Sequence, residues 1–387
     1  MNVRALMFGL VALLLAACGK PPEIEVPEGV EITPLESYSR IESWFLLKMA
    51  GVEGVSVPHA VDIYRVVHST RPEDGEAVRA SGLMALPRGV APKRIVSFQH
   101  GTTTSRDEVP SKPDLTGVAA SILFAGNGYM LIAPDYLGLG ESEGVHGYYV
   151  ASDHARAVTG LLAAVRQLPD APSAPIFLSG FSQGGHVSLA AMRQLEAEGE
   201  TVLGAAPVAA ALDVRNISLG MALGGGSKSH ALYLAYMAWG YAHYYGRPLD
   251  SVLTEDYAAK VETLYGTPHS PDEIIEGLPA DPRVMFTPEF LEAFDTGGEH
   301  WMLEAIAANG VGEWTPKAPV RLFYGDADKD VVPEEAIAGA ERFRARGSDV
   351  EAVSVGEVGH DPSLLLAAPH ILEWLGELEA RIFTEGG

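Results

Sequence analysis

One strand-to-helix transition constrains the fold of this chain more than any other feature. A short apolar run, residues 176–178, leads into Gly180-Phe-Ser182-Gln-Gly184, and residues 187–198 follow with the helical spacing of apolar side chains. A serine held at a sharp turn between a strand and a helix needs glycine two residues to either side, because larger side chains would crowd the strained turn. The turn would raise the Ser182 hydroxyl above the sheet, with the N-terminus of the helix aimed at it. Ser182 is therefore a candidate nucleophile.

The same pattern occurs a second time, at residues 140–144, around Ser142. No apolar run leads directly into this copy, which lies in a glycine-rich stretch. Glu141 and Glu143 flank the serine, and their negative charges would oppose an alkoxide or oxyanion beside it. We interpret Ser142 as a loop serine and keep Ser182 as the candidate.

Apolar, β-branched runs alternate with helical patterns through most of the chain. Several later runs are almost continuously apolar, which is typical of strands buried on both faces. This alternation, with short connections, predicts an α/β fold with a mostly parallel, doubly wound sheet. We expect strands at residues 63–67, 83–86, 95–98, 130–133, 176–178, 203–208, 320–324 and 350–355, and helices at residues 150–168, 187–198, 334–346 and 371–382.

One long segment, residues 213–316, interrupts the alternation. It contains three consecutive glycines and many aromatic residues, but no long apolar strand. An insertion of ~100 residues is too long for a bare loop, so it should carry its own helices. We predict a helical cap at residues 213–316, inserted into a core made of residues 37–212 and 317–387.

Apolar and aromatic side chains face nearly all round one predicted helix of this cap, so the helix should be buried on more than one side. The helix either forms the core of the cap or roofs a substrate pocket with one of its faces. Tyrosine suits a pocket because its ring is apolar and its tip is polar. In the second interpretation we expect Tyr236 and Trp239 to line the pocket. The side chains concerned are Tyr233, Tyr236, Met237, Trp239, Tyr241, Tyr244 and Tyr245.

The first 17 residues indicate a signal peptide. Arg4 precedes an apolar run, residues 5–17, that is too short to span a bilayer as a permanent helix. The run ends in Leu-Ala-Ala before Cys18, which is the only cysteine, so an intramolecular disulfide is excluded. This ending is similar to a bacterial lipobox, in which the cysteine is lipidated; an ordinary secretory signal is the alternative. We expect a lipid-anchored protein of the bacterial cell envelope, bound to a membrane through Cys18.

Residues 18–36 are rich in proline and glutamate, a composition that predicts an extended tether. The formal net charge of the chain is −24 at pH 7. Binding of nucleic acid needs a basic face, so the charge excludes nucleic acid as a partner.

A serine hydroxyl is a poor nucleophile near neutral pH unless a neighbouring base removes its proton. Two polar turns after late strands supply partners for Ser182: residues 325–330 contain three aspartates, and His360 follows the last expected strand. His360 would take the serine proton, while a carboxylate would hold the histidine tautomer and stabilise the imidazolium. The other histidines, among them His154 and His186, are expected to be structural.

A third polar turn follows the expected strand at residues 95–98. Its sequence, His100-Gly101-Thr102, fits a loop in which a small residue lets a backbone N–H face the substrate. The N–H groups of Thr102 and Gln183 are our candidates for an oxyanion hole, and an ordinary glycine turn is the alternative. Each such donor contributes ~3 kcal/mol of transition-state stabilisation.

Together these motifs resemble the α/β-hydrolase superfamily, and more narrowly the secretory lipase family that includes the lipase A type. The resemblance rests on residues 99–102, 133–140 and 180–185 and on the order Ser182, aspartate, His360. It implies an α/β-hydrolase fold with an inserted helical cap, and a carboxylic-ester hydrolase with a small-molecule or lipid ester as substrate. It also implies that the enzyme uses no metal and no organic cofactor.

The resemblance also separates the three aspartates. Asp328 lies three residues before Val331, which matches the Gly-x-x-Asp-x-x-Val spacing of the family, so Asp328 is the favoured acid. Asp326 and Asp330 have an alternative interpretation as turn and helix-cap residues.

Two rival functions stay open at this stage. A serine peptidase on the same fold would use the same catalytic groups, since amide and ester hydrolysis share them. A non-catalytic lipoprotein could instead use the cap to bind a ligand, because a fold does not determine a function.

Overall fold

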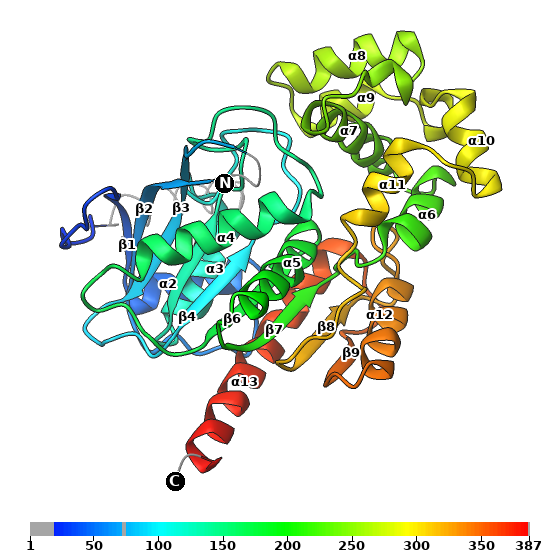
Figure 1. Cartoon of the computed structure of the whole chain (residues 1–387). Helices are drawn as coiled ribbons and strands as arrows, with labels where there is room; N and C mark the ends of the chain where they lie inside the picture. The colour runs from blue at the N-terminus through cyan, green and yellow to red at the C-terminus, as the bar shows by residue number, and fades with distance from the viewer. Residues whose placement is uncertain (1–18, 72–74, 386–387) are drawn as a thin grey trace, which may run out of the picture.

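The computed structural model describes residues 19–71 and 75–385, and its strands form one nine-stranded sheet with helices on both faces (Figure 1). The strand order is β1-β2-β3-β5-β4-β6-β7-β8-β9. The pairs β1/β2, β2/β3 and β3/β5 are antiparallel, whereas every pair from β5 through β4 to β9 is parallel. The strands are β1 (Glu31–Tyr38), β2 (Val61–Thr70), β3 (Val78–Pro87), β4 (Ile95–Gln99), β5 (Met130–Pro134), β6 (Ile176–Phe181), β7 (Val202–Val208), β8 (Val320–Tyr324) and β9 (Val350–Ser354).

Successive side chains of the central strands supply two apolar cores, one on each face of the sheet. In β3, Leu83 and Ala85 belong to one core and Met84 to the other, as the two-residue period of a strand requires. One core is completed by α2, α3 and α13, and the other by α4, α5 and α12 (Figure 1). These helices are α2 (Arg40–Met49), α3 (Leu115–Ala125), α4 (Ala151–Val165), α5 (Gln183–Ala197), α12 (Pro333–Ala345) and α13 (His360–Glu385).

The predicted α/β class with a mostly parallel, doubly wound sheet is confirmed, and each of the eight expected strands overlaps one of the strands β2–β9. Helix α3 was not expected, because its sequence is almost entirely small and apolar and has no polar stripe. Helix α13 begins at His360, well before the expected start at residue 371, although it contains Pro369.

The tether predicted for residues 18–36 is wrong over its last six residues. Residues from Glu31 onward form β1, which pairs with β2 at the edge of the sheet. Pro34 does not prevent this pairing, because an edge strand tolerates a residue without an N–H. Upstream of β1, the Tyr64 hydroxyl donates to the Pro22 carbonyl at 3.1 Å, so this segment also contacts the core. Cys18 and residues 1–17 lie outside the described residues.

Every described element between β7 and β8 is helical, and these helices form a lobe at one end of the sheet (Figure 1). Where the chain enters the lobe, the buried Glu335 carboxylate accepts the N–H groups of Leu212 and Asp213, both at 2.8 Å. Where the chain leaves it, the Asn309 amide oxygen accepts the Ala151 N–H at 2.9 Å. The elements are η1 (Val214–Ser218), α6 (Leu219–Leu223), α7 (Ser229–Tyr244), η2 (Leu249–Ser251), α8 (Glu255–Gly266), α9 (Pro271–Gly277), η3 (Pro282–Met285), α10 (Pro288–Thr296) and α11 (Trp301–Ala308).

Over residues 19–71 and 75–385, no helix combines the length and the apolar character that crossing a membrane would need.

Candidate active site

Ser182 occupies the turn between β6 and α5, with a backbone conformation that non-glycine residues rarely adopt. Its φ is 57° and its ψ is −120°. The surrounding structure holds the turn in place: the Ser182 N–H donates to the Val208 carbonyl at 2.9 Å, and the Ser182 carbonyl accepts the Gly185 N–H at 2.9 Å. Such a conformation costs ~1–3 kcal/mol and persists only where neighbouring contacts enforce it.

The glycines around Ser182 allow the start of α5 to pack directly on the end of β4. A Cβ atom on Gly184 would lie 2.0 Å from the Gln99 carbonyl oxygen, and one on Gly180 would lie 2.3 Å from the Gly184 carbonyl oxygen. Neither position can therefore carry a side chain without displacing backbone. This is the physical reason for the Gly-x-Ser-x-Gly pattern in this chain.

The structure brings Ser182, His360 and Asp328 together, although 178 residues separate the serine from the histidine. His360 Nε2 lies 2.9 Å from Ser182 Oγ, and His360 Nδ1 lies 2.7 Å from Asp328 Oδ2. The second carboxylate oxygen of Asp328 accepts the N–H groups of Asp330 and Val331, which orient the acid toward the histidine. The arrangement has the contacts needed to move the serine proton to His360 Nε2.

The alternative candidates for the acid and for the nucleophile make other contacts. Asp326 accepts the Ser354 hydroxyl at 2.7 Å, and Asp330 lies 3.9 Å from His230. Ser142 is buried, and its oxygen accepts the Gly138 N–H at 3.1 Å. Of the three aspartates, the one that contacts His360 is Asp328, as the family spacing suggested.

The predicted oxyanion loop lies beside the serine. Gly101 and Thr102 line the same cavity as Ser182, while Gln183 opens α5 directly after it. Within the described part of the chain, the backbone N–H groups of Thr102 and Gln183 donate to no protein acceptor, so both are free to bind a developing oxyanion. Their role as donors stays a prediction.

Two tyrosines hold this loop, and the sequence did not predict a role for either of them. The Tyr136 hydroxyl donates to the His100 carbonyl at 2.8 Å, and the two rings stack at 4.1 Å. The Tyr148 hydroxyl lies 2.8 Å from Thr102 Oγ1. Tyr136 has a φ of 66°, so its backbone is strained like that of Ser182. The only sequence signal for either residue was the Asp135-Tyr136 dipeptide after a predicted strand.

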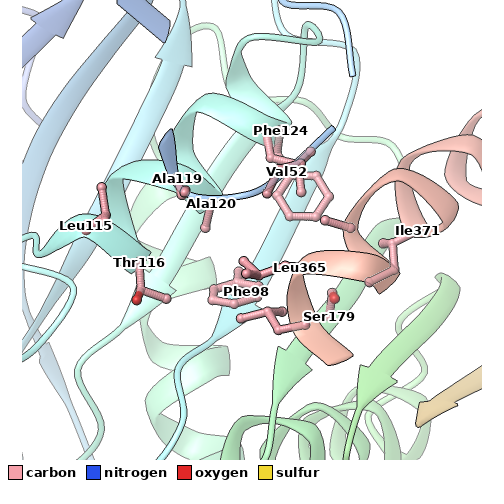
Figure 2. A pocket seen from close by; sticks show the side chains of 14 residues that line it. Val52, Phe98, Leu115, Thr116, Ala119, Ala120, Phe124, Ser179, Leu365 and Ile371 are labelled. Carbon is pink, nitrogen blue, oxygen red and sulfur yellow. The ribbon is translucent and has the colours of Figure 1, made fainter. Parts of the chain in front are cut away.

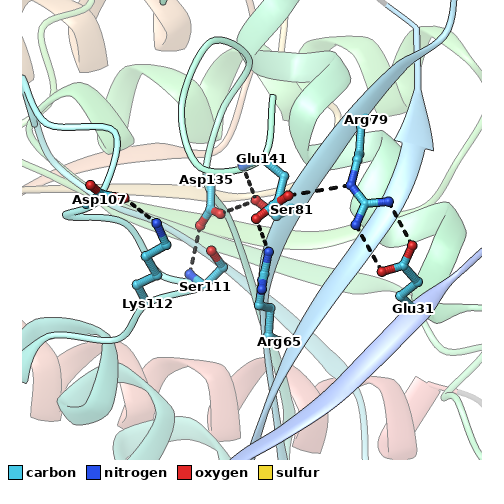
Figure 3. A network of polar contacts seen from close by, with 9 residues as sticks. All are labelled: Glu31, Arg65, Arg79, Ser81, Asp107, Ser111, Lys112, Asp135 and Glu141. Atoms are coloured by element: carbon cyan, nitrogen blue, oxygen red, sulfur yellow. Dashed lines mark hydrogen bonds and ion pairs between the residues drawn. The ribbon is translucent and has the colours of Figure 1, made fainter. Parts of the chain in front are cut away.

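Asp135 anchors the far end of the same loop (Figure 3). Its carboxylate accepts the Ser81 hydroxyl from β3 and the Ser111 N–H at 2.8 Å. Burial raises the pKa of Asp135 above its usual range, and the bonds from Ser111 and Ser81 partly counter this effect. Outside this buried contact, Arg65 and Arg79 pair with Glu141, and Arg79 also pairs with Glu31 (Figure 3). Asp135 therefore has a structural role.

Two cavities meet at Ser182. The larger, of about 260 Å³, lies on the core side of the serine, and its lining includes Phe98, Gly101, Thr102, Phe181 and His360. We call it the core-side cavity. The smaller, of about 50 Å³, lies under helix α7, and its lining includes Tyr149, Ser218, Tyr233, Met237 and Asp330. We call it the cap-side cavity.

The expectation that Tyr236 and Trp239 line the substrate pocket is wrong. Neither lines the two cavities that reach Ser182, and both are buried. The ring of Tyr236 stacks on the rings of Tyr148 and Tyr265, with centroid distances of 4.6 Å and 4.9 Å, so Tyr236 belongs to the core of the cap. The face of α7 that roofs the cap-side cavity is instead the stripe of His230, Tyr233, Leu234 and Met237. Helical periodicity predicted two buried faces but could not tell which one faces Ser182.

A cluster of neutral histidines surrounds the side chain of Gln183. His146 Nδ1 lies 2.8 Å from the Leu137 carbonyl and must donate to it, so His146 Nε2 is left to accept from the Gln183 amide at 2.9 Å. The same amide nitrogen lies 3.2 Å from His154 Nε2. Burial lowers the pKa of His146 to about 4 and holds the pKa of His154 well below its usual range. Burial also lowers the pKa of His186 to about 4.

This histidine cluster positions Gln183, whose backbone N–H is a predicted oxyanion donor.

No group of three or more histidine, cysteine or acidic side chains in the described ranges is arranged to hold a metal ion.

A sequence-family model described as "Hydrolase_4: Serine aminopeptidase, S33" matches residues 119–362. The match begins in α3 and ends in the first turn of α13, so it includes Ser182, Asp328 and His360. No curated protein matches the chain by sequence.

Solved structures that resemble the chain have the predicted fold. A proposed hydrolase from Legionella pneumophila subsp. pneumophila str. Philadelphia 1 is 25% identical and superposes with a TM-score of 0.84 over 90% of this chain and 97% of that one. The rice cell wall degrading esterase LipA from Xanthomonas oryzae is 24% identical, with a TM-score of 0.79 over 93% and 100% of the two chains. Candida antarctica lipase A in its closed state is 15% identical, with a TM-score of 0.63 over 78% and 73%. The resemblance to the α/β-hydrolase superfamily is confirmed.

The packing around Ser182 yields a stability prediction. Gly184→Ala should lower the free energy of unfolding by about 3 kcal/mol, because the new methyl group would meet backbone rather than a movable side chain. Gly376→Ala in α13 is the matched control: its methyl group meets nothing within 4 Å, and alanine in a helix should stabilise by ~1 kcal/mol. Urea denaturation of both variants measures the difference, and equal stabilities would contradict the packing argument.

The histidine cluster yields a pH prediction. Above pH 6.5 the buried histidines are neutral in both states, whereas between about pH 6.5 and about pH 4 only the unfolded chain binds their protons, so the free energy of unfolding falls as the pH falls. His146→Gln keeps a donor to Leu137 and an acceptor for Gln183, and should reduce this fall by up to about 3 kcal/mol. Urea denaturation at pH 7 and pH 4.5 tests this.

His370→Gln in α13 is the control, because it also removes one histidine, but one that is exposed. If both substitutions changed the pH dependence equally, burial of His146 would not be its cause.

Proposed function

The chain belongs to the Hydrolase_4 family (serine aminopeptidase, S33), and we propose that it is a serine hydrolase that cleaves carboxylic esters through an acyl-enzyme on Ser182. The observation that carries the proposal is the continuous contact from Ser182 Oγ to His360 Nε2 at 2.9 Å and from His360 Nδ1 to Asp328 at 2.7 Å. These contacts lie at a strained turn that exposes the hydroxyl to two cavities. A carboxylic ester is the substrate class that we propose.

In this mechanism, Ser182 Oγ attacks the carbonyl carbon of the ester while its proton passes to His360 Nε2. The carbonyl oxygen becomes negative and accepts the N–H groups of Thr102 and Gln183. The C–O bond to the alcohol then breaks, and the alcohol leaves with the proton from His360. Water, deprotonated by the same histidine, attacks the acyl-enzyme and releases the acid and free Ser182. Asp328 holds the histidine tautomer and stabilises the imidazolium throughout.

The chemistry of the core-side cavity favours an ester with an apolar acyl group. The lining of the core-side cavity includes the apolar side chains of Phe98, Ala120 and Phe181 beside several polar ones. The apolar side chains gain free energy from burying hydrocarbon, which supports an apolar acyl group.

A serine aminopeptidase is the second candidate, and one observation favours it besides the family description. Three carboxylates, those of Glu108, Asp114 and Asp361, lie along the exposed side of the core-side cavity, where they could attract the ammonium group of a peptide N-terminus. Asp114 already caps α3 by accepting the Gly117 N–H at 2.9 Å, and the other two are exposed to solvent. The three therefore provide a weak, water-screened site for an ammonium group.

The third candidate function, a lipoprotein that only binds a ligand, gains no support from the site. A binding protein would not need Asp328, His360 and Ser182 in hydrogen-bond contact, with the serine in a conformation that costs free energy.

The proposal includes an anchor at Cys18, supported by the Leu-Ala-Ala-Cys sequence that ends the apolar N-terminal run. Gly19 forms a bridge with Ser37, and Pro22 accepts the Tyr64 hydroxyl, so the chain after Cys18 runs along the sheet edge. A lipid on Cys18 would therefore hold the core close to the membrane of the cell envelope. A lipid with more than one acyl chain anchors stably, whereas a single chain does not.

Ser182→Ala should reduce kcat/KM for p-nitrophenyl acetate by at least ~10⁴-fold, because the hydroxyl forms the covalent intermediate. Ser142→Ala is the matched control: it removes a buried serine hydroxyl from the same sequence pattern and should retain ester hydrolysis. Aminoacyl p-nitroanilides, assayed beside the ester, decide between the two candidates. Hydrolysis of the anilides alone would replace the esterase proposal by the aminopeptidase.

Cys18→Ser should move the protein from the membrane fraction to the soluble fraction, because serine cannot receive the thioether-linked lipid. Fractionation after a high-salt wash, followed by immunoblotting, measures the distribution. Retention of the variant in washed membranes would contradict the lipid anchor and favour an uncleaved N-terminal segment.

A further inference from the structure

A third cavity, of about 180 Å³, lies between α3 and α13, over the ends of β4 and β6 (Figure 2). We call it the α3/α13 cavity. Fourteen residues line it, and only Thr116 and Ser179 among them have polar side chains. The Ser179 hydroxyl already donates to the Ala206 carbonyl at 2.8 Å, so it offers no free donor. The cavity therefore accepts hydrocarbon and little else.

This cavity adjoins the core-side cavity that contains Ser182. Phe98, Thr116 and Ala120 line both of them, so the two spaces lie on either side of the same residues. Figure 2 shows Phe98 at the base of the α3/α13 cavity, with Leu365 beside it. Phe98 belongs to β4, the strand that leads into the loop with Gly101 and Thr102. A chain that starts at a carbonyl bound by this loop has a direct course past Phe98.

We propose that the α3/α13 cavity binds the acyl chain of the ester, so that the enzyme prefers medium or long aliphatic acyl groups. This inference rests on the proposed esterase function. The acyl group remains attached to Ser182 after the alcohol has left, so an enclosed apolar site next to the nucleophile suits the acyl group. The cap-side cavity, on the other side of Ser182, is left for the alcohol; its lining combines apolar side chains with His230, Ser218 and Asp330.

The outer end of the α3/α13 cavity determines what happens to a longer chain. Leu115 lines this end and is 56% exposed, and Ala50 and Leu364 also line the cavity and are partly exposed. An acyl chain that exceeds the cavity can continue along this apolar rim instead of meeting a closed wall. Each methylene that enters the cavity should raise kcat/KM about fourfold, until the chain reaches the rim.

Two substitutions fill the cavity from opposite sides without touching the core-side cavity. Ala119→Phe adds a ring on α3, where the alanine is partly buried. Ala368→Leu adds bulk on α13, where the alanine is buried and the new side chain cannot turn to solvent. Neither alanine lines the core-side or the cap-side cavity. Ala338→Phe on α12, at another partly buried helical alanine, is the control.

The test compares kcat/KM for p-nitrophenyl acetate, octanoate and decanoate among the wild type and the three variants. Both cavity variants should lose about tenfold or more on the decanoate while changing less than about twofold on the acetate, and the control should match the wild type. An unchanged chain-length profile in both cavity variants would overturn the proposal. An equal loss on acetate and decanoate would also overturn it.

Octyl acetate, followed by titration of the released acid, identifies the part of the ester that occupies the cavity. The alkyl chain on its alcohol side has as many carbons as the acyl chain of p-nitrophenyl octanoate. A selective loss on octyl acetate would assign the cavity to the alcohol and overturn the proposal. A wild type without any ester hydrolysis would refute the proposed function itself, whereas an active wild type with a flat chain-length profile refutes this inference alone.

Discussion

The close packing of α5 on the end of β4 is the contact on which the rest of this structure depends. Because Gly184 has no side chain, its backbone approaches the Gln99 carbonyl at a distance that any Cβ atom would prevent. This approach forces Ser182 into a strained conformation, which the bond to Val208 and the surrounding parallel strands maintain. It also brings the first N–H of α5 next to the loop after β4. The nucleophile and the groups that would stabilise an oxyanion are therefore consequences of one backbone contact.

Behind this turn, the protein surrounds the site with buried polar groups that are kept neutral. The net charge of the chain is −24, yet the side chains around Gln183 are uncharged histidines and tyrosines. Burial lowers the pKa of His100 and His146 to about 4, so these rings act as hydrogen-bonding partners and not as charges. His360 differs from them because it contacts a carboxylate and lines an open cavity. In the proposed mechanism, proton transfer would use His360 alone among the histidines in the neighbourhood.

The helical lobe contributes one wall of the site and is tied to the core at both of its connections. Glu335 binds the entering chain, Asn309 of the departing chain accepts the Ala151 N–H of the core, and His230 of α7 contacts the Lys329 carbonyl beside Asp328 at 2.9 Å. The cap-side cavity is thus attached to the loop that carries the acid. The apolar space on the opposite side of Ser182 comes from the core helices α3 and α13. The acyl and alcohol parts of a substrate would consequently contact different layers of the molecule.

The sequence alone determined the strand-to-helix turn at Ser182, the eight strands β2–β9, the helical insertion and the positions of Asp328 and His360 after their strands. These features follow from local patterns, because apolar periodicity and glycine spacing act within a few residues. The contact of Asp328 with His360 agrees with the family spacing. Only the tertiary structure decided that residues from Glu31 pair with β2, and that Tyr233 rather than Tyr236 lines the cavities at the serine. It also revealed α3, whose sequence is almost entirely small and apolar and has no polar stripe that would indicate a helix. Each of these outcomes depends on packing between segments far apart in the chain, and periodicity cannot state which partner a buried face will meet.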